Sequence, residues 1–132
     1  MTNPLAMALA GCKRLPKDEA QAAIKRVKNA WMGAMLAPEN KDLWLPIFGA
    51  LNSVMASVAL KQGLFGKHNK KVLDELEAAI EQLAQTGQGK WAAVEDVLEA
   101  YEALVSRASL AQLYNIEQYV LDRKKKGNVT WI

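Results

Sequence analysis

Carboxylates recur at helical spacing in two segments of the chain. Glu77 and Glu81 stand four residues apart, and Glu95, Glu99 and Glu102 follow at steps of four and three. Each set falls on one face of a helix, and two such helices facing each other could hold a metal. The usual di-iron arrangement also needs Glu-x-x-His, which the sequence does not contain. We therefore interpret Glu77, Glu81, Glu95 and Glu99 as an acidic, solvated face that is a candidate for binding a basic partner.

The nucleophile and the imidazole of the sequence have no visible catalytic partners. His68 is the only histidine and stands beside Lys67, and Cys12 is the only cysteine and precedes Lys13 and Arg14. Neighbouring cations can lower the pKa of a thiol, but no base stands at a recognisable spacing from Cys12. The sequence contains none of the phosphate-binding, dinucleotide-binding or hydrolase motifs. We expect a protein that is not an enzyme and that uses no metal and no cofactor.

Charge is distributed unevenly along the 132 residues. The first 71 residues carry 11 basic and 4 acidic side chains, whereas residues 72–122 carry 2 basic and 10 acidic ones. Two interpretations stay open: the helices pair basic against acidic faces inside one bundle, or separate charged surfaces meet partners of opposite charge. The candidate basic residues for partner binding are Lys25, Arg26, Lys28, Arg123, Lys124, Lys125 and Lys126.

Apolar residues repeat with the period of an α-helix through most of the chain. The pattern predicts a short helix over 3–11 and longer ones from about 16 to 37, 42 to 61 and 69 to 84. A further apolar pattern begins near Trp91, and we favour a break at Ser106, with Ser106 or Ser109 capping a last helix that ends before Gly127. The prediction is an all-α protein: one domain, 1–132, forming a compact bundle of five to six helices, with 127–132 as a tail.

Two stripes define the expected core. In the third helix Trp44, Ile47, Phe48, Leu51, Val54, Met55 and Val58 form an uninterrupted apolar face, with Pro46 in the first turn or at a kink. In the second helix Ile24, Val27, Trp31, Ala34 and Met35 are expected to face inward. Lys25, Arg26 and Lys28 occupy the opposite face of that helix.

Membrane insertion is not expected. The longest apolar stretch, 43–60, contains Pro46, Gly49 and Asn52 and has the period of an amphipathic core helix. The apolar start of the chain has no basic residues before it, unlike a signal peptide. An unpaired cysteine is typical of a reducing compartment. We expect a cytoplasmic protein.

One set of residues points to a protein group. Gly11-Cys12-Lys13-Arg14-Leu15-Pro16-Lys17, Trp44, Ala50-Leu51-Asn52, Gly63 with Gly66, and Trp91 together resemble a loose group of small phage and prophage proteins. These are all-helical accessory proteins, some labelled Fis-like regulators. The resemblance implies phage origin, and by analogy with small phage proteins such as anti-CRISPR inhibitors it implies action by covering a surface of another protein.

The functional hypothesis is therefore a non-enzymatic phage or prophage accessory protein in the cytoplasm of the bacterial host. Its expected partner is a host or defence protein, and self-association is compatible with the pattern. The alternative is a DNA-binding transcriptional regulator that uses the basic N-terminal half. For that alternative the last helix offers Gln112, Asn115 and Gln118 at steps of three, although ordinary polar helix faces look the same.

Overall fold

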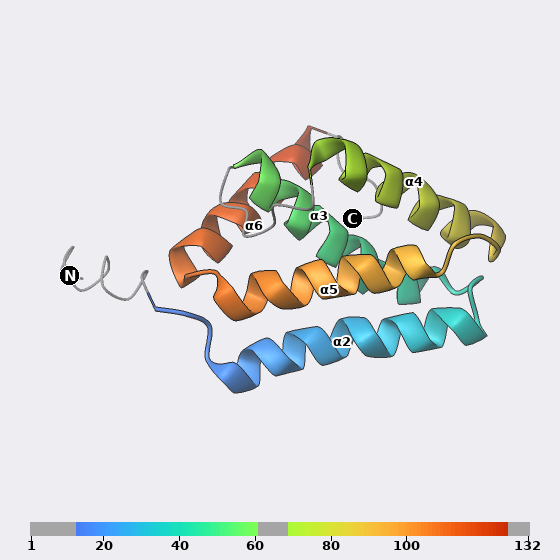
Figure 1. The fold of residues 1–132 in the computed structure, drawn as a ribbon, viewed down its shortest axis with the longest axis horizontal. Helices are drawn as coiled ribbons and strands as arrows, with labels where there is room; N and C mark the ends of the chain where they lie inside the picture. Colours follow the sequence, from blue (N-terminus) through green and yellow to red (C-terminus); the bar gives the residue numbers. More distant parts are fainter. Residues whose placement is uncertain (1–12, 61–68, 127–132) are drawn as a thin grey trace.

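The computed structural model describes residues 13–60 and 69–126, and these form an all-α bundle (Figure 1). The predicted all-α fold class is thus confirmed. The predicted helix over 3–11, the 127–132 tail, Cys12 and His68 all lie outside the described residues. The helices are α2 (Lys17–Leu36), α3 (Trp44–Ala59), α4 (Lys70–Thr86), α5 (Ala92–Arg107) and α6 (Leu110–Lys125), with a 3-10 turn, η1 (Lys41–Leu43), before α3.

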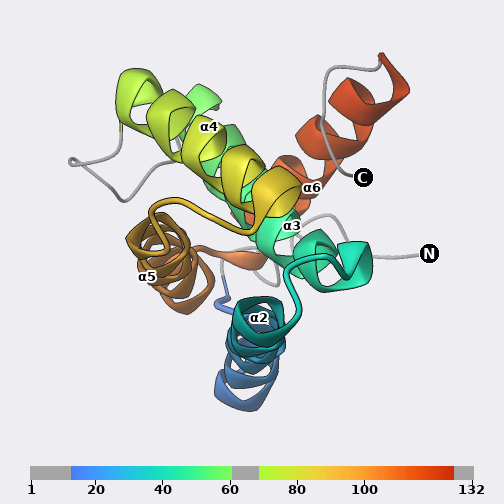
Figure 2. The same cartoon turned by 90° about the vertical axis from the view of Figure 1, so that its right-hand side faces the viewer.

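α3 is the central helix of the bundle. It contacts α2, α4, α5 and α6, so it has neighbours on almost every side. α2 and α5 lie side by side and run in opposite directions, while α4 and α6 cover the other side of α3 (Figures 1 and 2). This arrangement explains the composition of α3, because a helix surrounded by others buries nearly its whole circumference.

Burial in α3 follows the predicted stripe and extends beyond it. Trp44, Ile47, Phe48, Leu51 and Val54 are buried, as expected from their spacing. The remaining members of the stripe, Met55 and Val58, are half-buried, and Ala50, Ala56 and Ser57 are buried on other sides. The segment Lys41–Ala59 is also long and apolar enough to cross a membrane by length and composition, and half of its most apolar window is buried within the bundle.

Pro46 is accommodated without breaking α3. It occupies the third residue of the helix, counted from Trp44, where a backbone N–H has no partner within the helix. This confirms the expectation that the proline lies in the first turn.

The break between the last two helices lies three residues later than predicted. α5 continues through Ser106 to Arg107, and Ala108 is extended and fully buried. Ser109 then caps α6: its hydroxyl accepts from the backbone N–H of Gln112, and the Gln112 side chain accepts from the backbone N–H of Ser109. This reciprocal pair is available only to Ser109, since the residue three positions after Ser106 is Ser109 rather than a Glu or Gln. The preference for Ser106 was therefore wrong.

The chain before α2 is held against this same corner. The backbone N–H of Leu110 donates to the carbonyl oxygen of Lys13 at 2.7 Å, and Arg14 forms an isolated β-bridge with Ser109. The start of the described chain is thereby fixed to the junction of α5 and α6.

Candidate functional site

The basic residues predicted on α2 are all exposed. Lys25 and Lys28 lie on the outer side of the helix, away from the buried Ile24 and Val27. Arg26 lines a shallow groove with Leu45 and Tyr101. Burial raises the pKa of the Tyr101 hydroxyl, and the nearby charge of Arg26 opposes this rise. The α2 cations are thus available to a partner, with Arg26 set toward α3.

The basic residues at the end of α6 do not join those of α2. Figures 1 and 2 place α2 and the C-terminal end of α6 on opposite sides of α3. Lys124, Lys125 and Lys126 are exposed, and Lys126 pairs with Asp122 one turn earlier at 3.1 Å. Arg123 is half-buried in a cleft. The seven predicted basic residues therefore belong to two separate regions.

The four predicted acidic residues also occupy different environments. Glu77 is half-buried in a cleft to which α5 contributes no lining residue, whereas Glu95 and Glu99 are exposed on α5. Glu81 is half-buried one turn after Glu77. In the part of the chain that the structure describes, no group of three or more His, Cys, Asp or Glu residues is close enough to hold a metal ion.

The last two turns of α2 expose large apolar side chains. Met32, Met35 and Leu36 are 55%, 53% and 89% exposed. The prediction that Met35 faces inward was wrong: Ala34 is fully buried, and the next residue of an α-helix lies about 100° further around its axis. These three side chains continue the side of α2 that carries Lys25 and Lys28. We call Lys25, Lys28, Met32, Met35 and Leu36 the α2 outer face.

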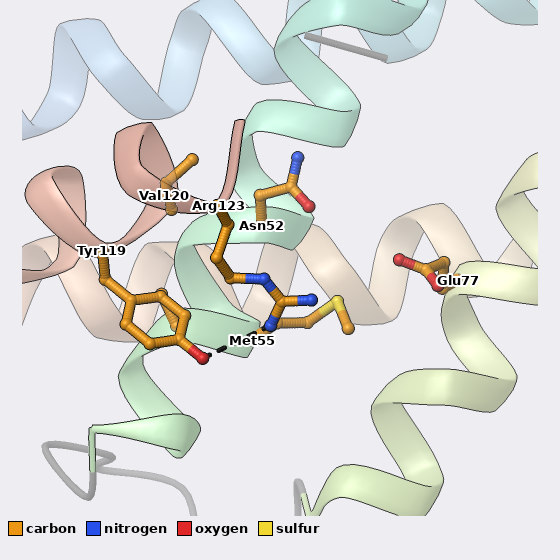
Figure 3. Close-up of a pocket in the computed structure, with 7 residues that line it drawn as sticks. Asn52, Met55, Glu77, Tyr119, Val120 and Arg123 are labelled. Atoms are coloured by element: carbon orange, nitrogen blue, oxygen red, sulfur yellow. Dashed lines mark hydrogen bonds between the residues drawn. The ribbon is translucent and has the colours of Figure 1, made fainter. Parts of the chain in front are cut away.

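A polar cleft lies between α3, α4 and α6 (Figure 3). Its inner end, about 20 Å³, is bordered by Asn52 of α3 and Val120 of α6. Its wider outer part, about 450 Å³, extends along α4 past Leu73 and Asp74. Both parts share four lining residues, which are Met55, Glu77, Tyr119 and Arg123. We call this region the α3–α4–α6 cleft.

Opposite charges face each other across this cleft. The Arg123 guanidinium donates to the Tyr119 hydroxyl at 3.3 Å and lies 5.7 Å from the centre of the Tyr119 ring. In Figure 3 the Arg123 side chain extends from α6 between Tyr119 and Glu77. Burial raises the pKa of the Glu77 carboxyl; the neighbouring Glu81 and Asp74 raise it further, while Arg123 lowers it. The cleft therefore combines a cation, a phenol and a destabilised carboxylate.

Asn52 is the least expected member of the cleft. It is 8% exposed, and its buried Nδ2 donates to no group among the described residues. Sequence reasoning missed Asn52 and Tyr119 as site residues. A single asparagine within the apolar α3 is a detectable signal, because buried amides normally have hydrogen-bond partners. The convergence of Tyr119 and Glu77 depends on how α6 crosses α3, which the sequence pattern does not specify.

Comparison with known proteins adds no further assignment: no family model, no curated protein and no solved structure matches this chain.

Proposed function

We propose that this protein acts without catalysis, by binding another protein through the α2 outer face. The observation that supports this proposal is the exposure of Met32, Met35 and Leu36 together at the end of one helix. Large apolar side chains that gather on a surface mark interaction sites, and methionine is enriched at the centres of protein interfaces. Burying these side chains against a partner would remove apolar surface from water.

The cations of the same face suggest the chemistry of the partner. Lys25 and Lys28 precede the apolar end by one to two turns, and both are exposed. Cations around an apolar centre attract an acidic partner and orient it during encounter. The proposed partner therefore has an apolar depression bordered by carboxylates.

The more specific proposal is a phage or prophage accessory protein, acting in the cytoplasm of its bacterial host on a host or defence protein. It rests on the resemblance carried by residues 11–17, Trp44, Ala50-Leu51-Asn52, Gly63 with Gly66, and Trp91. Inhibition by covering a surface, as in anti-CRISPR proteins, needs only an exposed binding face. The α2 outer face is such a candidate.

A DNA-binding regulator is the second proposal. Lys25, Arg26 and Lys28 are exposed on one helix, as phosphate contacts require. Phosphate binding releases counterions, so its affinity falls steeply as salt rises. The apolar end of α2 favours a protein partner, because DNA backbone contacts make no use of exposed Met and Leu side chains.

The test is affinity capture from a nuclease-treated bacterial host lysate, comparing three proteins. The first is the unaltered chain; the second carries Met32→Ser, Met35→Ser and Leu36→Ser. The control carries Tyr114→Ser and Leu121→Ser, which replace exposed apolar residues of α6. We expect a captured protein that the α2 variant loses and the α6 variant retains, with all three chains folded by circular dichroism. Equal capture by the two variants, or tight salt-sensitive binding of duplex DNA alone, would overturn the protein-binding proposal.

A further inference from the structure

The α3–α4–α6 cleft contains a buried hydrogen-bond donor with no partner among the described residues. Asn52 lies in α3 next to the fully buried Leu51, and its Nδ2 is inaccessible to solvent. A buried donor without an acceptor destabilises a fold, whereas an apolar residue of the same shape at this position would not. The amide also borders the inner end of the cleft. An acceptor atom of a ligand placed there would satisfy it.

The two walls of the cleft offer opposite charges to such a ligand. Arg123 reaches into the cleft from α6, and Glu77 faces it from α4 (Figure 3). Further out, Lys70 and Asp74 repeat the same combination at the mouth. A simple anion would be attracted by Arg123 but repelled by Glu77 and Asp74, and a simple cation would meet the reverse. The charges instead suit a ligand that carries both signs.

We propose that the α3–α4–α6 cleft binds a small zwitterion of the amino-acid type. Its carboxylate contacts the Arg123 guanidinium and the Asn52 amide, and its ammonium group contacts the Glu77 carboxylate. Guanidinium groups bind carboxylates through paired, charge-assisted hydrogen bonds, which gives this end of the ligand its orientation.

The apolar lining indicates which kind of side chain the ligand carries. Met55 and Val58 of α3 and Leu73 of α4 line the outer part of the cleft. Its volume of about 450 Å³ lies within the range of small-molecule sites, about 300–1,000 Å³. Methionine adapts its shape to irregular apolar groups. The ligand class is therefore an amino acid with an aliphatic side chain, of which L-leucine is the test probe.

The state of Glu77 agrees with an ammonium group at this position. Burial raises the pKa of its carboxyl, which means that its charge is poorly stabilised in the protein alone. A ligand ammonium beside it would supply a second positive charge in addition to that of Arg123. Binding of the zwitterion would thus favour the charged form of Glu77.

The first experiment compares L-leucine with two fragments of it, using chemical-shift changes of backbone amides in the ¹⁵N-labelled full chain. 4-Methylpentanoate has the carboxylate without the ammonium, and leucinol has the ammonium without the carboxylate. We expect saturable shifts in α3, α4 and α6 with L-leucine, with a dissociation constant of about 1 mM or lower. Each fragment should bind at least tenfold more weakly. No saturable shift with L-leucine, or equal binding of a fragment, would overturn the proposal.

The second experiment uses three variants, each with a matched control on the same helix or of the same type. Asn52→Leu, Arg123→Gln and Glu77→Gln should each weaken L-leucine binding at least tenfold. Their controls, Asn115→Leu, Lys124→Gln and Glu81→Gln, make the same or an analogous change outside the cleft lining. Asn52→Leu is the sharpest test, because it should weaken binding while keeping or raising the melting temperature. A variant set that binds L-leucine as tightly as the controls would contradict the assignment.

Discussion

The indole rings of Trp44 and Trp91 stack with their centroids 5.7 Å apart and their planes inclined by 29°. The contact joins the start of α3 to the residue before α5, which are far apart in the sequence. Trp44 is fully buried, and its Nε1 donates to the carbonyl oxygen of Pro38 at 2.9 Å. One side chain therefore holds together three segments: the α2–α3 connection, α3 and the start of α5.

This relationship predicts coupling between the two tryptophans. Trp44→Ala should lower the free energy of unfolding by about 3–5 kcal/mol, the usual cost of truncating a buried aromatic residue. Trp91→Ala should cost less, because Trp91 is only half-buried. In a double-mutant cycle by urea denaturation, we expect an interaction energy of about 0.5–1.5 kcal/mol. Strict additivity of the two losses would show that the stacking itself contributes nothing.

Leu51 provides a test of the central position of α3. Its side chain is fully buried within the main core cluster. Leu51→Ala should reduce the free energy of unfolding by about 2–5 kcal/mol, because it leaves a cavity that the packed neighbours cannot fill. Chemical denaturation measures this loss directly. A reduction below about 1 kcal/mol would be inconsistent with a core role for α3.

Two glycines should respond to alanine with opposite signs. Gly87 ends α4 with a φ of 72°, and a Cβ there would lie 3.0 Å from Pro38 Cγ. Gly87→Ala should therefore destabilise the fold by about 1 kcal/mol or more, since both the backbone and the contact are unfavourable. Gly49 lies within α3, and a Cβ there meets nothing within 4 Å.

The matched change Gly49→Ala should stabilise the fold by about 0.5–1 kcal/mol, because alanine has the higher helix propensity. Thermal unfolding of both variants gives the comparison. Shifts of the melting temperature in the same direction would contradict the assigned backbone conformation at Gly87 or the open space at Gly49.

The sequence pattern predicted the helices better than it predicted their surroundings. The stripe in α3 was correct at Trp44, Ile47 and Phe48, because alternation of buried and exposed positions follows directly from 3.6 residues per turn. Met35 failed because an apolar residue was assumed to be buried, while its helical position is set by Ala34 beside it. Apolar type and helical position usually agree, and they separate where an interface replaces the core.

The cleft shows the same limit for polar residues. Arg123 was grouped with Lys124, Lys125 and Lys126 as one basic run, since they are consecutive in the sequence. Consecutive helical residues point in directions about 100° apart, so a run of four cannot share one surface. Which of them enters the bundle depends on the crossing of α6 with α3. That angle is determined by packing between helices and not by the charges of the run.

Glu77 predicts a pH dependence of stability. Burial raises the pKa of its carboxyl above the ordinary value of 4.5, so the folded state binds the proton more tightly than the unfolded state does. Above the folded pKa the charged carboxylate destabilises the fold, and this cost disappears as the pH falls through that value toward 4.5. Glu77→Gln should therefore be more stable than the unaltered chain at neutral pH, with a gap that closes in acid.

Urea denaturation of both proteins over a series of pH values measures this gap. Glu99→Gln, an exposed position on α5, provides the comparison for the same chemical change outside the cleft. A gap for Glu77→Gln that stays constant, or that widens toward acid, would show that Glu77 is not destabilised by its burial.

The last prediction concerns the α2 cations in partner binding. Replacing Lys25, Arg26 and Lys28 by Glu reverses three exposed charges on a helix whose buried side, including Ile24 and Val27, is unchanged, so the fold should persist. Association with an acidic protein partner should slow by about tenfold or more at low salt, because attraction during encounter becomes repulsion. The loss should shrink at high salt, where exposed charges are screened.

Affinity for the captured partner, measured at two salt concentrations with circular dichroism as the folding check, decides this prediction. Cys12→Ala and His68→Ala serve as controls and should leave binding unchanged, since neither residue has a catalytic partner visible in the sequence. If Cys12→Ala abolished activity in a folded chain, catalysis would replace binding as the proposed function. An unaffected triple reversal would instead move the binding surface to the acidic residues, of which Glu95 and Glu99 on α5 are the exposed ones.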